Sequence, residues 1–484
     1  MSFSQAGMLA YQIYKTWDVR FGIETVYYIF VTRSYHKMWP KLTILLLMMM
    51  SAAEIHCQQD SLLVLSGRVL CSGRPVPYAA LQLQGSSVGV HCNDAGEYLL
   101  KIPQGRERDT VTVRSLGYEG RKVPVGKLLK NGDVRLKARA IELKTVTVSD
   151  YGTAYQLLLA AVEGIKQNYH QQTAWSTFFY RDWRAVDGEL FLFDEAVMCV
   201  QRCPYSQYAD KRGYLLDPSQ REMESNIKTI LRHRLLVYDR KLLESKIVRG
   251  RGCDQMLAYS DNVDFFDPVA TPQASYALAE RILRQHRFEP IRTFVDDGEV
   301  YYLLRSVGPC RTPKARTNYE YTIRRRDLAL VRLVSSKQTF RHRAPTDPWV
   351  NWYYNTMIDE TDSSVWTYAV RNGHYTLTHY YNATSSRLES SRNGHDGEKQ
   401  HWMQCHEWVL TDFDMIGANG NNDENNDRQV PVHPQLLPSA FGISSYDKDF
   451  WGRYNTIPID SLPLQLLKQK YSKAASKKSF NYLR

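Results

Sequence analysis

Short apolar strands separated by turn residues dominate the stretch from Leu65 to Tyr118. Apolar and polar positions alternate within Leu65–Leu70, Ala79–Leu83 and Tyr98–Ile102, and Pro, Asn and Gly lie between these runs. Alternation with a period of two is typical of strands that bury one face, and Gly, Pro and Asn supply the turns between them. The sequence therefore predicts a small β-sandwich over residues 61–138.

A helix follows the sandwich after a connecting stretch at residues 139–152. Val146 and Val148 alternate with Thr there, which indicates one extra strand or an extended linker. Thr153 is a good N-cap, and apolar residues recur behind it at helical spacing. They are Ala154, Leu157, Leu158, Ala161 and Ile165. We expect an amphipathic helix that ends near Asn168 and opens a second domain at residues 153–415.

The second domain continues as a series of strands. Aromatic residues alternate in Phe178–Arg181 and Phe191–Val197, and later runs are separated by turns such as Asp296-Asp297-Gly298 and Asn372-Gly373. Asn-Gly is the favoured two-residue hairpin turn. The later strands are expected at Glu299–Arg305, Tyr319–Arg324, Leu328–Lys337, Val365–Arg371, Tyr375–Tyr381 and Trp408–Phe413.

This succession of hairpins predicts an antiparallel sheet, wrapped as a half-barrel or a large sandwich, with Arg and Lys outward and Tyr, Leu and Val inward. The predicted fold class is mainly β, or α+β, with an N-terminal β-sandwich followed by a larger antiparallel domain that begins with an entry helix.

The last part of the chain alternates between polar and aromatic composition. Residues 416–430 are rich in Asn and Asp and predict a solvated, mobile loop. The segment 431–465 carries Phe450, Trp451 and Tyr454, whose spacing places Phe450 and Tyr454 on one side of a helical turn. Three aromatic residues after so polar a loop are expected to be buried. The basic tail, residues 466–484, is expected to fray.

Several motifs of the sandwich together resemble the carboxypeptidase-regulatory-like domain, a transthyretin-like (prealbumin-like) fold at the front of many exported Bacteroidetes proteins. The matching residues are Ser66-Gly67-Arg68-Val69, Pro75-Val76-Pro77-Tyr78-Ala79, Asn93-Asp94-Ala95-Gly96 and Ser115-Leu116-Gly117-Tyr118. Such domains serve as adaptors, so the resemblance implies the fold and export of the chain but no activity.

The second domain also resembles the uncharacterised domain that accompanies regulatory-like domains. The resemblance rests on Asn168-Tyr169, Phe179-Tyr180-Arg181, Glu195-Ala196-Val197 and the closing motif Tyr446–Asn455. It implies a structural role for Tyr180, Arg181, Glu195, Phe450, Trp451 and Tyr454. Arg181 and Glu195 lie on neighbouring predicted strands, where a buried ion pair is expected more than a ligand site.

The N-terminal part has the features of a secretory leader. Lys41 precedes the apolar run Leu42–Ala53, which ends in small residues and is too short for the roughly 20 residues of a membrane helix. We interpret residues 38–57 as a signal peptide, cleaved after Ala53 or just before Gln58, and residues 1–37 as an upstream extension outside the true start. Cys57 allows lipid anchoring as a minor alternative. The predicted location is exported, in the periplasm or associated with the outer membrane.

Charge and cysteine content refine this picture. The chain has 62 basic and 51 acidic residues, a net charge of +11. For an exported protein this favours a solvated basic face, or peripheral contact with an anionic membrane surface, over nucleic acid. Seven cysteines remain after the leader, so at least one has no intramolecular partner. Cys199 and Cys203 are spaced for a local bridge, and Cys71 and Cys92 share the sandwich.

Motifs with catalytic potential are weak. His286 and Glu289 match a zinc-binding His-x-x-Glu pair, but no His-Glu-x-x-His helix accompanies them. Gly85–Gly89 matches Gly-x-Ser-x-Gly, but strands flank it on both sides. Asp194 and Glu195 are adjacent and face opposite sides of a strand. His401, Cys405 and His406 fall in a predicted strand. We predict no catalytic residue, cofactor or metal.

Aromatic residues provide the remaining candidate site. Trp349, Trp352, Tyr353 and Tyr354 form one loop-like run, and exposed aromatics stack on sugar rings or dock proteins. The sequence therefore predicts a binding or assembly module of the cell envelope that contacts an unknown envelope protein or glycan. The alternative is an envelope hydrolase acting on peptide or glycan, which would require a pocket holding a perturbed carboxylate or His.

Overall fold

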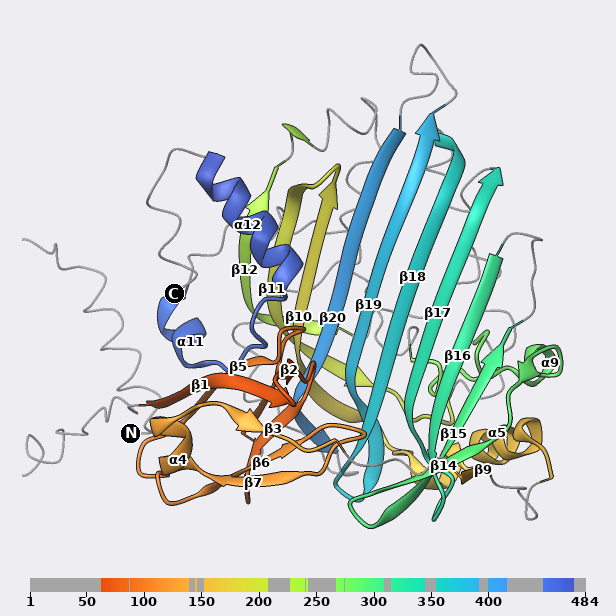
Figure 1. Cartoon of the computed structure of the whole chain (residues 1–484), viewed down its shortest axis with the longest axis horizontal. Helices are drawn as coiled ribbons and strands as arrows, with labels where there is room; N and C mark the ends of the chain where they lie inside the picture. The colour runs from red at the N-terminus through yellow and green to blue at the C-terminus, as the bar shows by residue number, and fades with distance from the viewer. Residues whose placement is uncertain are drawn as a thin grey trace, which may run out of the picture. The chain divides into compact units, whose positions relative to one another are not determined.

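The computed structural model shows a chain built mainly from antiparallel β-strands (Figure 1). It describes residues 62–86, 88–138, 144–145, 152–207, 227–239, 241–242, 267–273, 275–308, 315–343, 354–390, 399–415 and 447–473. From Leu62 onward the chain forms one compact unit. None of the helices in this described part combines the length and apolar character that a membrane span requires.

The N-terminal part is a sandwich of two four-stranded sheets. One contains β1 (Leu62–Cys71), β2 (Arg74–Pro75), β5 (Glu97–Pro103) and β8 (Val134–Arg135). The other contains β3 (Ala80–Leu83), β4 (Gly89–His91), β6 (Thr110–Arg114) and β7 (Arg121–Pro124), and α4 (Val125–Lys130) follows β7. Leu81, Leu83, Val111 and Val113 are buried between the sheets, because alternate residues of a strand lie on the same face.

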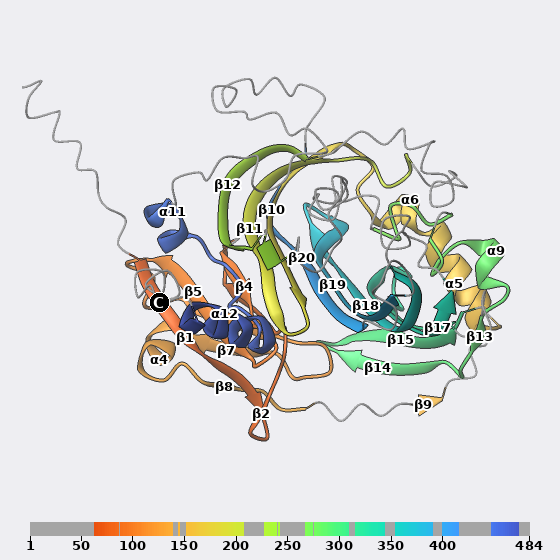
Figure 2. The same cartoon turned by 90° about the horizontal axis from the view of Figure 1, so that it is seen from above.

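A twelve-stranded sheet makes up most of the remainder, in the order β12-β11-β10-β20-β19-β18-β17-β16-β15-β14-β9, with β13 also on β15. Its strands are β9 (Lys144–Thr145), β10 (Ala174–Val186), β11 (Glu189–Arg202), β12 (Ile227–Tyr238), β13 (Arg287–Phe288), β14 (Arg292–Asp296), β15 (Glu299–Val307), β16 (Ala315–Arg324), β17 (Leu330–Arg343), β18 (Tyr354–Arg371), β19 (His374–Ser390) and β20 (Lys399–Met415). Figure 2 shows that this sheet is strongly curved.

Three short helices lie on the concave side of the sheet, α5 (Ala154–Glu163), α6 (Ile165–Asn168) and α9 (Glu280–Leu283) (Figure 2). Thr153 begins α5 with a capping box, because its hydroxyl accepts from the backbone N–H of Gln156 and the Gln156 side chain reaches back. The apolar stripe of α5 packs against Phe178, Tyr180 and Trp408 of the sheet. The entry helix predicted from residues 153–168 is therefore present.

The C-terminal segment carries two helices, α11 (Lys448–Arg453) and α12 (Ser461–Lys473). Leu466 and Leu467 of α12 are buried against the sheet, and the Tyr471 hydroxyl donates to the carbonyl of Leu236 at 2.6 Å. The prediction that the tail frays from residue 466 is thus wrong as far as Lys473, since an apolar stripe interrupts its basic residues. The Asn-rich loop at 416–430 lies outside the described residues.

The fold class predicted from the sequence is confirmed, and the strands are longer than the apolar pattern indicated. The turn Asn372-Gly373 closes the β18–β19 hairpin with positive φ at both residues, and Asp297-Gly298 does the same between β14 and β15. The connecting stretch contributes β9 to the large sheet. The two pairs that the sequence leaves open as bridges, Cys199 with Cys203 and Cys71 with Cys92, are not bonded in this structure.

Candidate functional site

The sandwich, the large sheet and the C-terminal segment 447–473 meet along one contact region, which we call the seam. The side chain of Asn455 pairs with the backbone of Lys101 like a neighbouring strand, accepting from its N–H at 2.7 Å and donating to its carbonyl at 2.9 Å. The Lys101 ammonium donates to the carbonyls of Trp451 and Tyr454 at 3.0 and 2.9 Å. These bonds tie β5 to the residues around α11.

A second set of bonds joins the loop before β5 to the start of α12. Asp460 accepts from the backbone N–H of Asp94 at 2.9 Å and from the Tyr78 hydroxyl at 3.4 Å, and Ser461 donates back to the Asp94 carboxylate. Burial and the negative charge of Glu407 raise the pKa of Asp460 to about 6. Tyr78 lies in the left-handed region with φ of 54°, which strains a bulky side chain.

A buried ion network lies beneath these bonds. Arg181 pairs with Glu195 at 2.7 Å and with Glu407 at 3.4 Å, and donates to the carbonyl of Ile457 at 2.5 Å. Arg234 also pairs with Glu195. Burial alone would raise the pKa of Glu195, but Arg234 and Arg181 outweigh it, so this pKa lies below its usual value. The ion pair expected between Arg181 and Glu195 is present, and it also anchors the C-terminal segment.

Two histidines connect this network to the sandwich. The Nε2–H of His379 on β19 donates to the Glu407 carboxylate at 3.0 Å, and the ring of His91 on β4 stacks on His379 with centroids 5.3 Å apart. Burial, with the positive charges of His379 and Arg371, lowers the pKa of His91 to about 4. His91 is therefore neutral at pH 7 although it lies against charged residues.

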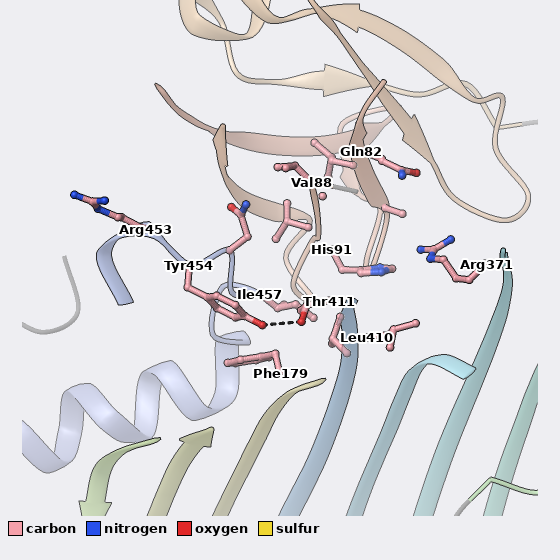
Figure 3. Close-up of a pocket in the computed structure, with 16 residues that line it drawn as sticks. Gln82, Val88, His91, Phe179, Arg371, Leu410, Thr411, Arg453, Tyr454 and Ile457 are labelled. Atoms are coloured by element: carbon pink, nitrogen blue, oxygen red, sulfur yellow. Dashed lines mark hydrogen bonds between the residues drawn. The ribbon is translucent and has the colours of Figure 1, made fainter. Parts of the chain in front are cut away.

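A cavity of about 300 Å³ opens along the seam beside His91 (Figure 3). The sandwich contributes β3 and β4, the large sheet contributes β10, β18 and β20, and the C-terminal segment contributes residues after α11. Its lining residues are Ala80, Leu81, Gln82, Val88, Gly89, Val90, His91, Phe179, Arg371, Val409, Leu410, Thr411, Arg453, Tyr454, Asn455 and Ile457. Polar and apolar groups are therefore mixed over its wall.

Hydrogen bonds fix part of this wall. The Tyr454 hydroxyl donates to Thr411 at 2.8 Å, and Thr411 donates to the carbonyl of Thr177 at 3.0 Å. Figure 3 shows the His91 ring and the Arg371 guanidinium directed toward one another, while the Arg453 guanidinium points away from the cavity. Arg371 is the last residue of β18, held in place by the Asn372-Gly373 turn.

Of the structural residues implied by the resemblance, Tyr454 lines this cavity, and the others pack in the sheet or around α11. Trp451 is 4% exposed and packs with Phe179 and Val409, while Phe450 and Tyr454 stack on one another at 5.0 Å. The Tyr180 ring packs against Trp408 on the concave side. Of the three aromatic residues of the closing motif, Trp451 is buried as expected, and Phe450 and Tyr454 are half-buried. The guanidinium groups of Arg232 and Arg234 on β12 stack on Phe450 and Trp451.

The predicted aromatic binding run lies almost entirely outside the part of the chain that the structure describes. Trp349, Trp352 and Tyr353 lie outside the described residues, and Tyr354 is the first residue of β18. Gln82, His91, Arg371 and Asp460 were not predicted, because they are single polar residues far apart in the chain. The favoured Asn-Gly turn beside Arg371 was the one local signal near them.

The weak catalytic motifs have ordinary structural places. The ring of His286 bonds Ser306 at 3.0 Å and stacks on Tyr319, and Gly85–Gly89 lies on the connection between β3 and β4, with Ser87 outside the described residues. Asp194 pairs with His233 at 2.6 Å. His401, Cys405 and His406 all lie on β20, and no three His, Cys, Asp or Glu residues within the described ranges converge as a metal site.

Comparisons with known proteins give little further information. No family model and no curated protein matches the chain. Among solved structures, the chain is weakly similar to a protein of unknown function from Bacteroides fragilis NCTC 9343 whose description suggests membrane association. The match covers 72% of this chain and 98% of that one, at 8% identity and a TM-score of 0.11.

Proposed function

We propose that this chain is an exported binding module of the cell envelope and that its ligand site is the seam cavity. The observation that carries the proposal is that three separate parts of the chain form one cavity and are locked together around it. Arg181 joins β10, β11 and β20 to the C-terminal segment, and Lys101 joins the sandwich to the same segment. Pre-formed cavities of mixed polarity are the usual small-ligand sites of proteins.

Export to the periplasm or the outer membrane is part of this proposal. It is supported by Lys41, the apolar run Leu42–Ala53 and the resemblance of the sandwich motifs to regulatory-like adaptor domains. The proposed ligand is an envelope glycan or the accessible end of an envelope protein. The net charge of +11 fits a surface that works beside anionic lipids or glycans.

Binding is favoured over hydrolysis by the chemistry of the cavity wall. The described lining residues supply a guanidinium, an imidazole, amides, hydroxyls and apolar side chains. A hydrolase would need a nucleophile with its base, or two carboxylates on either side of one bond. The carboxylates of the seam, Glu407, Glu195 and Asp460, each have partners within the seam network.

The proposal is tested by filling the cavity. Val88→Trp would place an indole in it, and Val295→Trp is the matched control because Val295 is 50% exposed on β14. The full chain is titrated calorimetrically with envelope-type saccharides and peptides, and the mixtures are then analysed for cleavage. We expect Val88→Trp to abolish binding while the control binds like wild type. Undiminished binding by Val88→Trp would place the site elsewhere, and cleaved ligand would make the chain a hydrolase.

A further inference from the structure

We propose that the seam cavity binds a carboxylate-bearing saccharide, with the carboxylate on Arg371 and ligand hydroxyls on His91 and Gln82. This inference rests on the proposed function, because it specifies the ligand of the same cavity. It is carried by hydrogen-bonding groups of Arg371, His91 and Gln82 in the cavity wall that remain available to a ligand.

Arg371 supplies the cation. Its guanidinium donates to the carbonyl of the adjacent Val370 at 3.0 Å, and no ion pair joins it to an acidic side chain among the described residues. Arg371 as a whole is exposed, but desolvation by nearby protein atoms lowers the pKa of its guanidinium, which stays charged at pH 7. A partly desolvated cation beside a neutral imidazole favours an incoming anion.

The charge on this side of the cavity suits a single carboxylate. Arg453 also lines the cavity, but its guanidinium points away in Figure 3, so one guanidinium faces the ligand. A guanidinium presents parallel N–H donors that match the two oxygens of a carboxylate. A phosphate carries up to two negative charges and is usually bound by several cations or backbone N–H groups. The described lining residues do not bring several such donors together at one point.

His91 and Gln82 supply acceptors. The Nδ1 of His91 lies 3.4 Å from the carbonyl of Tyr78, which can only accept, so Nδ1 carries the proton and Nε2 keeps its lone pair. The Gln82 amide nitrogen donates to the carbonyl of Ser86 at 3.0 Å, which leaves its oxygen for a ligand. These two acceptors require hydrogen-bond donors on the ligand. Hydroxyl groups fit better than an ammonium group, because the positive charge of Arg371 would repel an ammonium.

The remaining wall and the size of the cavity also suit a sugar. Val88, Leu410 and Ile457 line the cavity and offer apolar contact to the C–H face of a ring (Figure 3). A volume of about 300 Å³ is at the lower end for small-ligand sites and accommodates one or two rings. A peptide carboxyl terminus also carries a carboxylate, but it brings amide N–H groups that are fewer and less freely oriented than the hydroxyls of a sugar.

The surrounding structure holds these groups in place before a ligand arrives. The Asn372-Gly373 turn fixes Arg371, and the stack on His379 with its Glu407 bond fixes His91. Gly89 lets β4 approach β3, since a side chain there would lie 2.7 Å from the carbonyl oxygen of Leu81. Pre-organised groups bind more tightly because less conformational freedom is lost on binding.

The test is calorimetric titration of the full chain with digalacturonate, with its uncharged dimethyl ester, with inorganic phosphate and with the peptide Ala-Ala-Ala. We expect digalacturonate to bind most tightly. Arg371→Gln should weaken it at least about tenfold, the scale of a lost charged hydrogen bond. Arg326→Gln is the matched control, because Arg326 is exposed and lies outside the cavity lining, and it should bind like wild type. His91→Phe keeps the stack on His379 but loses the acceptor, so it should weaken binding several-fold without changing the melting temperature.

The outcomes separate this inference from the proposed function. Equal affinity for digalacturonate and its ester, or unchanged binding by Arg371→Gln, would overturn the carboxylate inference. The proposed function would still be tested separately by Val88→Trp. Tighter binding of phosphate or of the peptide would overturn the saccharide class. Failure of the chain to bind any of the four probes would likewise overturn the inference, and the proposed function would then depend on the wider ligand panel.

Discussion

Trp451 gives the sharpest test of how the C-terminal segment contributes to stability. Its side chain is 4% exposed and packs with Phe179, Val197 and Val409, and the guanidinium of Arg234 lies 4.3 Å from the ring centroid. Truncating a buried Trp to Ala costs about 3 to 5 kcal/mol, a range that includes the lost cation–π contact.

The expected shift in melting temperature follows from the size of the compact unit. Residues 62–484 are about 420 residues, and an unfolding entropy of about 2.1 cal/mol/K per residue gives roughly 0.9 kcal/mol/K. Trp451→Ala should therefore lower Tm by about 3 to 6 °C, as measured by differential scanning calorimetry. The bonds from Lys101 to the carbonyls of Trp451 and Tyr454 mean that the sandwich is also affected.

Trp175→Ala is the control, because Trp175 lies on β10 and is 36% exposed. A surface substitution changes stability by about 0.5 kcal/mol, so this variant should melt within about 1 °C of wild type. An unchanged Tm for Trp451→Ala, with loss of partner binding instead, would show that the closing motif is an exposed docking peptide and would refute the burial of Trp451 described above.

Further predictions concern acid, autonomy and export. Because the folded pKa of Asp460 is raised to about 6, ionisation of Asp460 destabilises the folded chain above pH 6. As the pH falls from 7 to 4, the Tm of wild type should therefore rise relative to the Tm of Asp460→Asn. A wild-type Tm that falls relative to that of Asp460→Asn between pH 7 and pH 4 would contradict this. The pKa of His91 is lowered to about 4, so its protonation should destabilise wild type as pH falls from 6.5 to 4. His91→Phe should lose less stability over the same pH range. Equal acid sensitivity of the two proteins would exclude that role. The fragment 61–138 has its own core and should melt cooperatively with a β circular-dichroism spectrum, whereas a coil-like spectrum would show that it depends on the seam. Mass spectrometry of the exported chain should find an N-terminus between Glu54 and Asp60, and intact Met1 in the cytosol would contradict export.

Much of the fold could be predicted because it depends on local patterns. Alternation located the strands, Thr153 marked the start of α5, and Asn372-Gly373 marked a hairpin. Strand lengths were underestimated, since the outer half of β19 reads Asn-Ala-Thr-Ser-Ser-Arg and shows no apolar alternation. Neighbouring strands supply its backbone partners, and sequence patterns carry no signal of that pairing.

The candidate site could not be predicted, because each of its residues is ordinary in its local sequence. His91 lies on a three-residue strand and Arg371 at the end of a long one, and only the long-range contact of β4 with the large sheet brings them together. Arg181 and Glu195 were found because the resemblance marks both of them on neighbouring predicted strands, and the structure shows that they are register partners. The same reasoning cannot join elements from separate sheets.

Hydrogen–deuterium exchange on the full chain with and without saturating digalacturonate tests most directly whether the seam cavity is the ligand site. Residues 80–82 and 88–91 of the sandwich and residues 453–455 and 457 line the cavity from two parts of the chain, and we predict that ligand slows their exchange together. Protection confined to residues 349–354, the aromatic run, or unchanged exchange at the cavity despite calorimetric binding, would contradict the assignment of the seam cavity as the binding site.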